Sequence, residues 1–120
     1  MNNKRRAKLR KIIDKIKGLV FPIDADDVND VQNLVNELYD DVEDFYSEES
    51  DSYDNLPESL QDSERGEAMQ DAMDELDNAM SELATLVDEL AAAEDGSADW
   101  DVCRKAANSA VDAILCRAFA

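Results

Sequence analysis

The longest regular pattern of hydrophobic positions in the chain lies between Asp62 and Ala93. Apolar residues follow one another there at alternating spacings of four and three: Met69, Met73, Leu76, Met80, Leu83, Val87 and Leu90. This heptad spacing is typical of a helix that buries one side against another helix. Alanine and leucine residues repeat every seven positions beside this seam, so the apolar face is wider than a coiled-coil stripe. The pattern predicts a helix over residues 63–94 whose opposite face is almost wholly acidic.

A second seam precedes it, in residues 24–48, and consists of Val28, Val31, Val35, Leu38, Val42 and Phe45. Asp24 is suited to the N-cap of this helix, because Ile23 and Val28 then have the spacing of a hydrophobic staple. Residues 49–62 are rich in Ser, Asp and Asn and contain Pro57, which predicts a connecting loop. Two long amphipathic helices joined by one loop predict an antiparallel helical hairpin.

Two shorter helices are predicted at the ends of the chain. Residues 3–20 form a basic amphipathic pattern that Pro22 ends, and residues 98–119 form a helix with many small residues after Gly96. Leu56 and Leu60 are expected to tuck under the hairpin, with one short helical turn after Pro57. The sequence therefore predicts an all-α fold in a single helical domain, residues 1–120: an antiparallel helical hairpin extended to a small bundle of about four helices.

The charge of the chain is extreme and unevenly distributed. The net charge is -18, eight of the twelve Lys and Arg residues lie in residues 1–17, and residues 24–62 hold fifteen Asp and Glu with no basic residue. Such a surface repels nucleic acids and anionic membranes and attracts a basic partner. We therefore expect no direct binding to nucleic acid and none to membranes, and no apolar run approaches the length of a membrane span.

The residues that carry most enzyme chemistry are missing or badly placed. The chain has no histidine and only three glycines, so it offers no imidazole base and no phosphate-binding loop. Cys103 and Cys116 have no metal-site spacing and are interpreted as small buried hydrophobes. Residues 95–101 contain three acids but not the ligand order of a calcium loop. We expect no catalytic residue, no cofactor and no metal.

Two features leave alternatives open. Met69, Met73 and Met80 are expected to fill the core, and the alternative is a groove that repacks around a partner helix. The basic helix over residues 3–20 is expected to dock on the acidic hairpin, in its own chain or in a twin chain, so a homodimer stays open. The alternative for this helix is nucleic-acid binding.

Residues 53–69 read YDNLPESLQDSERGEAM. This segment resembles a link found in a group of short acidic helical proteins, mostly uncharacterised, that phages and mobile elements of Gram-positive bacteria carry. The likeness covers about residues 3–93, and the chain departs from the group at Pro22 and over residues 97–120. The resemblance implies a mobile-element origin and a helical hairpin but no activity. With no signal peptide in view, it also implies a cytoplasmic location in a bacterial host cell.

The acidic second helix suggests a function. Residues 24–49 hold eleven acids, and 26 helical residues span about 39 Å, which gives one charge per roughly 3.5 Å. One strand of B-form DNA carries one charge per about 3.4 Å. The hypothesis is an acidic nucleic-acid-mimicking inhibitor that occludes the basic groove of a bacterial defence nuclease, of anti-CRISPR or anti-restriction type. The predicted contact residues are Asp40, Asp41, Glu43, Asp44, Glu48, Glu49, Asp51 and Asp54, and Tyr46 and Tyr53 are expected to add stacking.

The alternative is a non-catalytic, coiled-coil-like structural or adaptor protein of a phage or mobile element, which associates with itself through its heptad seams. Its acidic residues would then serve only as a solvated face, which is the usual role of a charge run.

Overall fold

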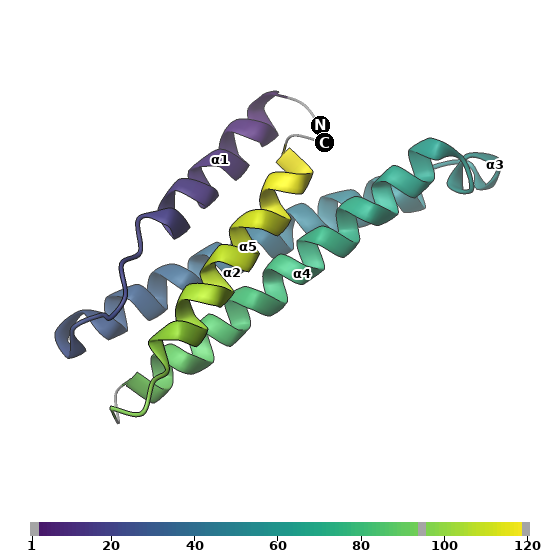
Figure 1. The fold of residues 1–120 in the computed structure, drawn as a ribbon. Coiled ribbons are helices and arrows are strands. Elements are labelled where there is room, and N and C mark those ends of the chain that lie inside the picture. The colour runs from purple at the N-terminus through teal and green to yellow at the C-terminus, as the bar shows by residue number, and fades with distance from the viewer. Residues whose placement is uncertain (1–2, 94–95, 119–120) are drawn as a thin grey trace.

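The computed structural model describes residues 3–93 and 96–118, and that part of the chain forms five helices and no strand (Figure 1). They are α1 (Asn3–Lys17), α2 (Ala25–Asp54), α3 (Glu58–Gln61), α4 (Glu64–Ala93) and α5 (Trp100–Ala118). The prediction of an all-α small bundle is confirmed.

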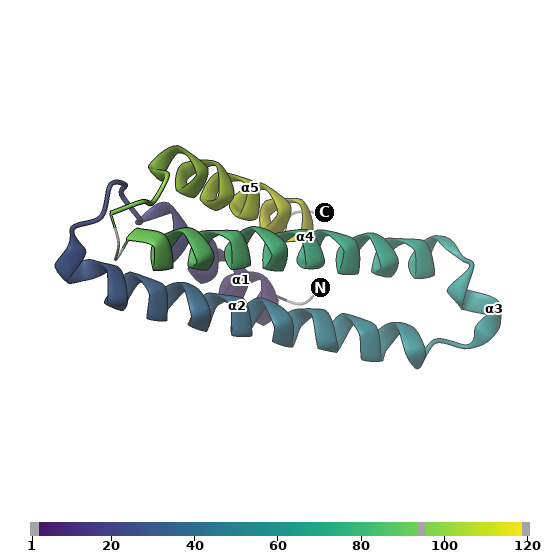
Figure 2. The same cartoon turned by 90° about the horizontal axis from the view of Figure 1, so that it is seen from below.

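The helices form two layers. α2 and α4 run antiparallel as a long hairpin that α3 closes at one end (Figure 1). α5 returns along α4, and α1 packs against α5 and runs antiparallel to it. Together α1 and α5 cover the half of the hairpin away from α3, as the view from below also shows (Figure 2). The molecule is therefore elongated, with extents of 53 × 23 × 19 Å.

One continuous hydrophobic core joins α1, α2, α4 and α5. Each helix contributes most of the apolar face that its periodicity predicts, and the largest fully buried side chains include Leu9, Ile16, Val35, Leu38, Leu76, Leu83, Leu90 and Ile114. α5 contributes mostly small residues, which allow its backbone to approach α4 closely. The two seams that the sequence places on α2 and α4 meet inside the hairpin.

Two predicted helix ends are wrong. α1 ends at Lys17 rather than at residue 20, because Gly18 is a poor helix former and the chain turns there. α2 continues to Asp54 instead of ending at residue 48. The Ser and Asp residues of 49–54 lower helix propensity only slightly, so the helix ends only where Pro57 restricts the backbone ahead of it.

The predicted loop over residues 49–62 is accordingly much shorter. Only residues 55–57 and 62–63 lie outside helices, and α3 forms one turn between them. Leu56 is half-buried, whereas Leu60 is 44% exposed and does not tuck under the hairpin. The other two helices differ from prediction by one or two residues, and Glu94 and Phe119 lie outside the described residues.

Side-chain caps explain several residues of the segment that links α2 and α4. Gln61 Nε2 lies 3.4 Å from the carbonyl oxygens of both Tyr53 and Leu56, so it satisfies the C-terminal end of α2. Ser63 Oγ donates to Leu60 O and accepts from Gly66 N, so it caps α4. These residues hold the hairpin closed, and none of them needs a chemical role.

Gly66 is required by close packing, which gives a first prediction. A Cβ atom on Gly66 would lie 1.9 Å from the carbonyl oxygen of Gln61. Gly66→Ala is therefore expected to destabilise the fold by about 1–3 kcal/mol, although alanine is the better helix former. Gly18→Ala is the control, since its nearest neighbour would be 3.4 Å away. Urea unfolding measures both, and an unchanged midpoint for Gly66→Ala would contradict the close contact.

Candidate functional site

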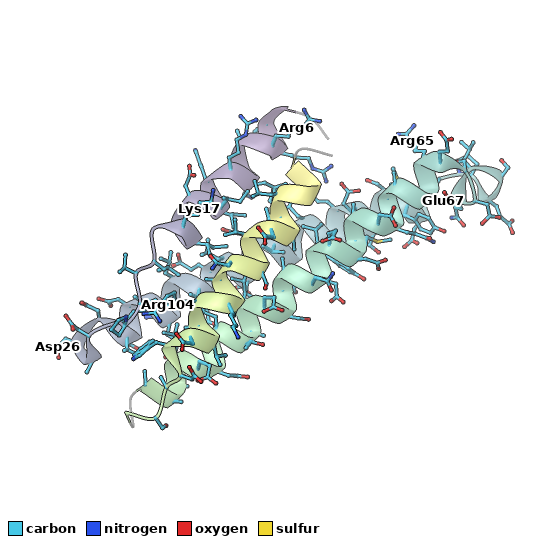
Figure 3. The ribbon with its side chains drawn as sticks, in the orientation of Figure 1. Arg6, Lys17, Asp26, Arg65, Glu67 and Arg104 are labelled. Carbon is cyan, nitrogen blue, oxygen red and sulfur yellow. The ribbon has the colours of Figure 1, made fainter. Side chains whose placement is uncertain are left out.

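The tertiary structure separates the charges of the chain onto two sides. α1 carries eight basic residues and one acid, whereas α2 carries twelve acids and no basic residue. Every Lys and Arg except Arg65 lies in α1 or α5, which form one layer. Figure 3 shows Arg6, Lys17 and Arg104 on that layer and Arg65 near Glu67 at the far end of the hairpin. The protein thus has a basic side and an acidic side.

The predicted contact residues all lie on α2, but they do not all face solvent. The exposed ones are named here the α2 acidic surface: Asp40, Glu43, Asp44, Asp51 and Asp54. Their spacing places them on one face of the helix over about 21 Å. Asp41 is half-buried, and Glu48 is exposed but binds Arg5.

Glu49 is buried, and its prediction as part of the exposed surface is wrong. The residue is only 3% exposed, because it follows Phe45 by four positions and shares the inward face of α2. The two tyrosines that were expected to add stacking make contacts within the chain. Tyr46 packs against the core, and the Tyr53 hydroxyl accepts a 2.8 Å hydrogen bond from Gln70 Nε2 on α4. Both rings therefore serve the hairpin.

Arg5 ties the basic helix to the acidic one. Its Nε donates to Glu48 Oε2 at 2.8 Å, its Nη2 also contacts that oxygen, and its Nη1 lies 3.8 Å from Glu49 Oε1. Lys8 Nζ lies 5.5 Å from the centre of the Phe45 ring, within the range of a cation–π contact. α1 was expected to dock on the hairpin of its own chain or of a twin chain. The contacts of Arg5 and Lys8 with α2 support docking in its own chain.

Removal of this arginine is expected to weaken the fold. Arg5→Met removes the guanidinium that lies beside the buried Glu49 carboxylate. We expect a loss of about 1–3 kcal/mol of unfolding free energy, because a buried charge then loses part of its electrostatic stabilisation. Lys15→Met removes the same charge from an exposed position of α1 and should change stability by less than about 0.5 kcal/mol. Thermal unfolding of both variants at one salt concentration checks this, and equal losses would mean that only overall charge matters.

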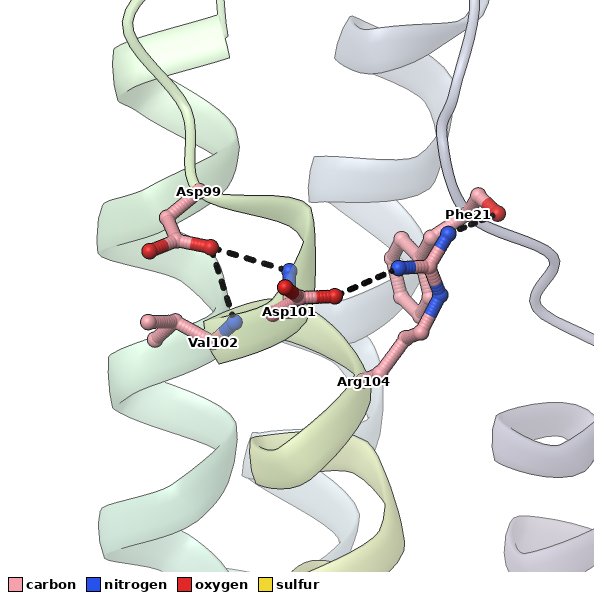
Figure 4. Close-up of polar contacts among 5 residues, drawn as sticks. All are labelled: Phe21, Asp99, Asp101, Val102 and Arg104. Atoms are coloured by element: carbon pink, nitrogen blue, oxygen red, sulfur yellow. Dashed lines mark hydrogen bonds and ion pairs between the residues drawn. The ribbon is translucent and has the colours of Figure 1, made fainter.

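The segment between α1 and α2 is anchored to the first turn of α5. Arg104 Nη2 donates to Phe21 O at 2.8 Å while Nη1 pairs with Asp101 Oδ1 at 2.8 Å (Figure 4). The Phe21 ring lies 6.1 Å from the Trp100 ring. Asp99 Oδ1 accepts from the backbone N–H groups that open the helix, which fixes the start of α5. These contacts hold the basic layer in place over the hairpin.

Cys103 is fully buried and chemically quiet. Burial raises the pKa of its thiol from 9.0 to about 11, with further increases from the charges of Glu89 and Asp99. A thiol with this pKa holds almost no thiolate at neutral pH, so it is a poor nucleophile. The interpretation of Cys103 as a small buried hydrophobe agrees with this burial, whereas the side chain of Cys116 lies outside the described residues.

The raised pKa of Cys103 makes stability depend on pH. Because the folded pKa exceeds the unfolded one, the contribution is complete below about pH 9 and is lost as pH rises toward 11. We expect wild type to lose on the order of 2 kcal/mol more than Cys103→Ala between those pH values. Urea unfolding at several pH values measures the difference, and parallel curves for the two proteins would contradict it.

Within residues 3–93 and 96–118, no group of three or more Cys, Asp or Glu side chains is placed to hold a metal ion. The same part of the chain contains no helix long and apolar enough to cross a membrane. Comparison with protein-family models, curated proteins and solved structures finds no match to this chain. The α2 acidic surface is therefore judged on its own geometry and charge.

Proposed function

We propose that this protein is an acidic nucleic-acid-mimicking inhibitor, which occludes the basic groove of a bacterial defence nuclease of CRISPR or restriction type. The observation that carries the proposal is the charge of α2: twelve acids in thirty residues with no basic residue among them. Ten of these acids are exposed, and thirty helical residues span about 45 Å, so the exposed charges have a mean spacing of roughly 4.5 Å. That value approaches the 3.4 Å or so between charges on one DNA strand.

The packing of α2 supports this use of its charges. Its inward face is held by Val35, Leu38 and Val42, each at most 1% exposed. The α2 acidic surface is thus carried on a rigid element, and binding would not have to order it first. α2 carries no cation of its own, although Lys4, Arg5 and Lys8 of α1 line a pocket together with Asp44 of the surface.

The mechanism requires no turnover. The α2 acidic surface would occupy the cationic side chains that normally contact phosphates, and the bulk of the bundle would exclude nucleic acid from the groove. Affinity should fall steeply as salt rises, because each neutralised cation regains its counterion. A bacterial cytoplasm is the location in which such a target would be met.

Capture from a bacterial lysate tests the proposal. The tagged full-length protein is incubated with lysate at low and then moderate salt, and retained proteins are identified by mass spectrometry. We expect one nucleic-acid-binding protein in stoichiometric amount, displaced by excess duplex DNA. Retention of only scattered basic proteins that leave together as salt rises would contradict the proposal.

A second candidate is the structural or adaptor role, in which the chain associates with itself. The observation that favours it is incomplete burial at one end of the α4 seam, where Met69 and Met73 remain half-buried. Sedimentation at high salt separates the two candidates. A stable oligomer with no affinity for basic proteins would support self-association, and a monomer would support the inhibitor.

A further inference from the structure

The hairpin has a free end, named here the arm, which comprises residues 48–73. α1 and α5 cover the other half of the hairpin, and the arm with α3 projects beyond them in both views (Figures 1 and 2). Two long helices therefore leave the four-helix part of the molecule with only each other and α3 for contact. This arrangement exposes whatever apolar surface the arm carries.

The apolar surface of the arm is not fully buried. The last large side chains of the hydrophobic core are Phe45 on α2 and Leu76 on α4, which are 3% and 0% exposed, and only the small Ala72, 4% exposed, is a buried hydrophobic residue of α4 beyond them. Beyond these two residues, Leu56, Met69 and Met73 are only half-buried. The heptad seam of α4 thus continues into the arm, but α1 and α5 do not extend far enough to cover it there.

A groove lies where this seam emerges. Its volume is about 560 Å³, and it begins beside the first turn of α1. The lining residues are Arg5, Glu49, Ser52, Asn55, Leu56, Arg65, Ala68 and Met69. Leu56, Ala68 and Met69 give it an apolar part, and the flexible Met69 side chain can adapt to different shapes. We name it the arm groove.

The arm around the groove is strongly acidic. Residues 48–73 hold nine Asp and Glu and one basic residue, Arg65, while the groove lining itself contains Arg5, Arg65 and Glu49. Arg65 is the single basic residue of α2, α3 and α4, and Figure 3 shows it at this end of the hairpin. A partly apolar groove in an acidic arm is complementary to an apolar stripe flanked by Lys and Arg.

The chain itself shows such a helix beside the groove. α1 buries Leu9, Ile12 and Ile16 in the core and places Arg5 on Glu48, next to the groove. A basic amphipathic helix is thus the kind of element that already covers this protein where the arm begins. A partner helix of the same chemistry would continue that cover along the arm.

We propose that the arm groove binds a basic amphipathic helix of the target protein, an inference that rests on the proposed function for the identity of that target. Apolar side chains of the helix enter between Leu56 and Met69. Its Lys and Arg residues face the carboxylates of the arm. Arg5 and Arg65, which line the groove, oppose part of this attraction and so lower affinity for the most basic helices.

A second copy of this chain fits the groove less well. Its own basic helix is already fixed by the buried side chains of Leu9, Ile12, Ile13 and Ile16. Two arms brought together would face each other with like charges and repel. The observations therefore favour a helix from a different protein.

The test uses the full-length protein and a fluorescent peptide with the sequence of residues 1–20 as the probe. A scrambled peptide of identical composition has the same charge but no apolar stripe. We expect the ordered peptide to bind about tenfold more tightly than the scrambled one, because only it places apolar side chains in the groove. Equal affinity for the two peptides would overturn the proposal.

Variants of the groove make the test specific. Ala68 is exposed and lies on a helix, so Ala68→Gln fills the groove without changing charge or the core. It should reduce the preference for the ordered peptide by about tenfold, and Leu56→Ser should do the same. Leu60→Ser removes an exposed leucine that does not line the groove and should leave the preference unchanged. Unchanged preference in both groove variants would overturn the proposal.

Two further readouts separate the other occupants. Arg65→Gln should strengthen binding of the basic peptide, whereas weaker binding would indicate an acidic ligand and overturn the proposal. A photo-crosslinker on the peptide should label residues 52–56 and 65–69. Labelling of α5 instead would show that the peptide replaces α1, and this too would overturn it.

Failure of this inference is distinguishable from failure of the proposed function. The peptide preference depends on Leu56 and Ala68, whereas occlusion of a nuclease depends on the α2 acidic surface. Loss of the preference with intact inhibition would reject the groove alone. Retained preference with no nuclease captured would reject the inhibitor alone.

Discussion

Reversal of Asp40, Glu43 and Asp51 to lysine is expected to abolish binding to a basic groove while the bundle stays folded. All three residues are exposed on one face of α2, and none of them takes part in the contacts of Arg5 described above. The substitution changes six units of charge where the proposed contact is made. We expect affinity for the captured target to fall about 100- to 1,000-fold, and the dependence on salt to become shallower.

The matched control reverses three acids elsewhere on the same molecule. Asp71, Asp77 and Asp88 are exposed on α4, and their reversal gives the same net charge. This variant should keep most of its affinity, because the contact surface on α2 is intact. Circular dichroism establishes that both proteins remain helical. If the two triple variants lose affinity equally, binding depends on net charge and the α2 acidic surface is not a defined site.

Truncation of Leu83 is expected to cause the largest loss of stability among single core changes. Leu83 is 0% exposed and lies in α4, the helix that packs against both α2 and α5. Leu83→Ala removes buried methyl groups and leaves a cavity where these helices meet. We expect a loss of about 3 kcal/mol of unfolding free energy, within the range seen for buried leucines. For a chain of this size that corresponds to a decrease in Tm of roughly 10 °C.

Val87 supplies the comparison for Leu83. It belongs to the same seam but is only half-buried, so Val87→Ala leaves a smaller void. Its expected cost is about 1 kcal/mol. Differential scanning calorimetry at fixed salt measures both variants. Similar Tm values for the two would mean that the seam is not packed as the structure describes.

The failure of the predicted loop shows where local sequence is least informative. Residues 49–54 hold three acids and two serines, which suggests a loop, yet they extend α2 by six residues. The propensity cost of such residues is a few tenths of a kcal/mol each. Continuation of a hairpin whose caps are made by Gln61 and Ser63 outweighs that cost. The backbone constraint of Pro57 is stronger, and the helix ends just before it.

The candidate site was predictable in part. The acids of α2 are visible in the sequence, but their exposure is not, and Glu49 is the residue that the structure removes. Arg5 contacts both Glu48 and Glu49, although Arg5 and Glu48 are 43 positions apart in the sequence. Neither segment contains a local pattern that predicts these contacts. For the arm groove, the sequence offered only the methionines of the seam. Their pattern is compatible with a place in the core or in a groove and does not distinguish the two.

By itself, the sequence determines the helical class, the apolar face of each helix and the charge of each segment. These properties follow from a repeat of 3.6 residues and from composition, which are local. Only the tertiary structure decides that α1 lies beside α5, that the basic residues gather on one side and that half of the hairpin is left uncovered. Those outcomes depend on which apolar faces fit together across distant segments. The hairpin is left partly uncovered because α1 and α5, with 15 and 19 residues, are shorter than α2 and α4, with 30 residues each.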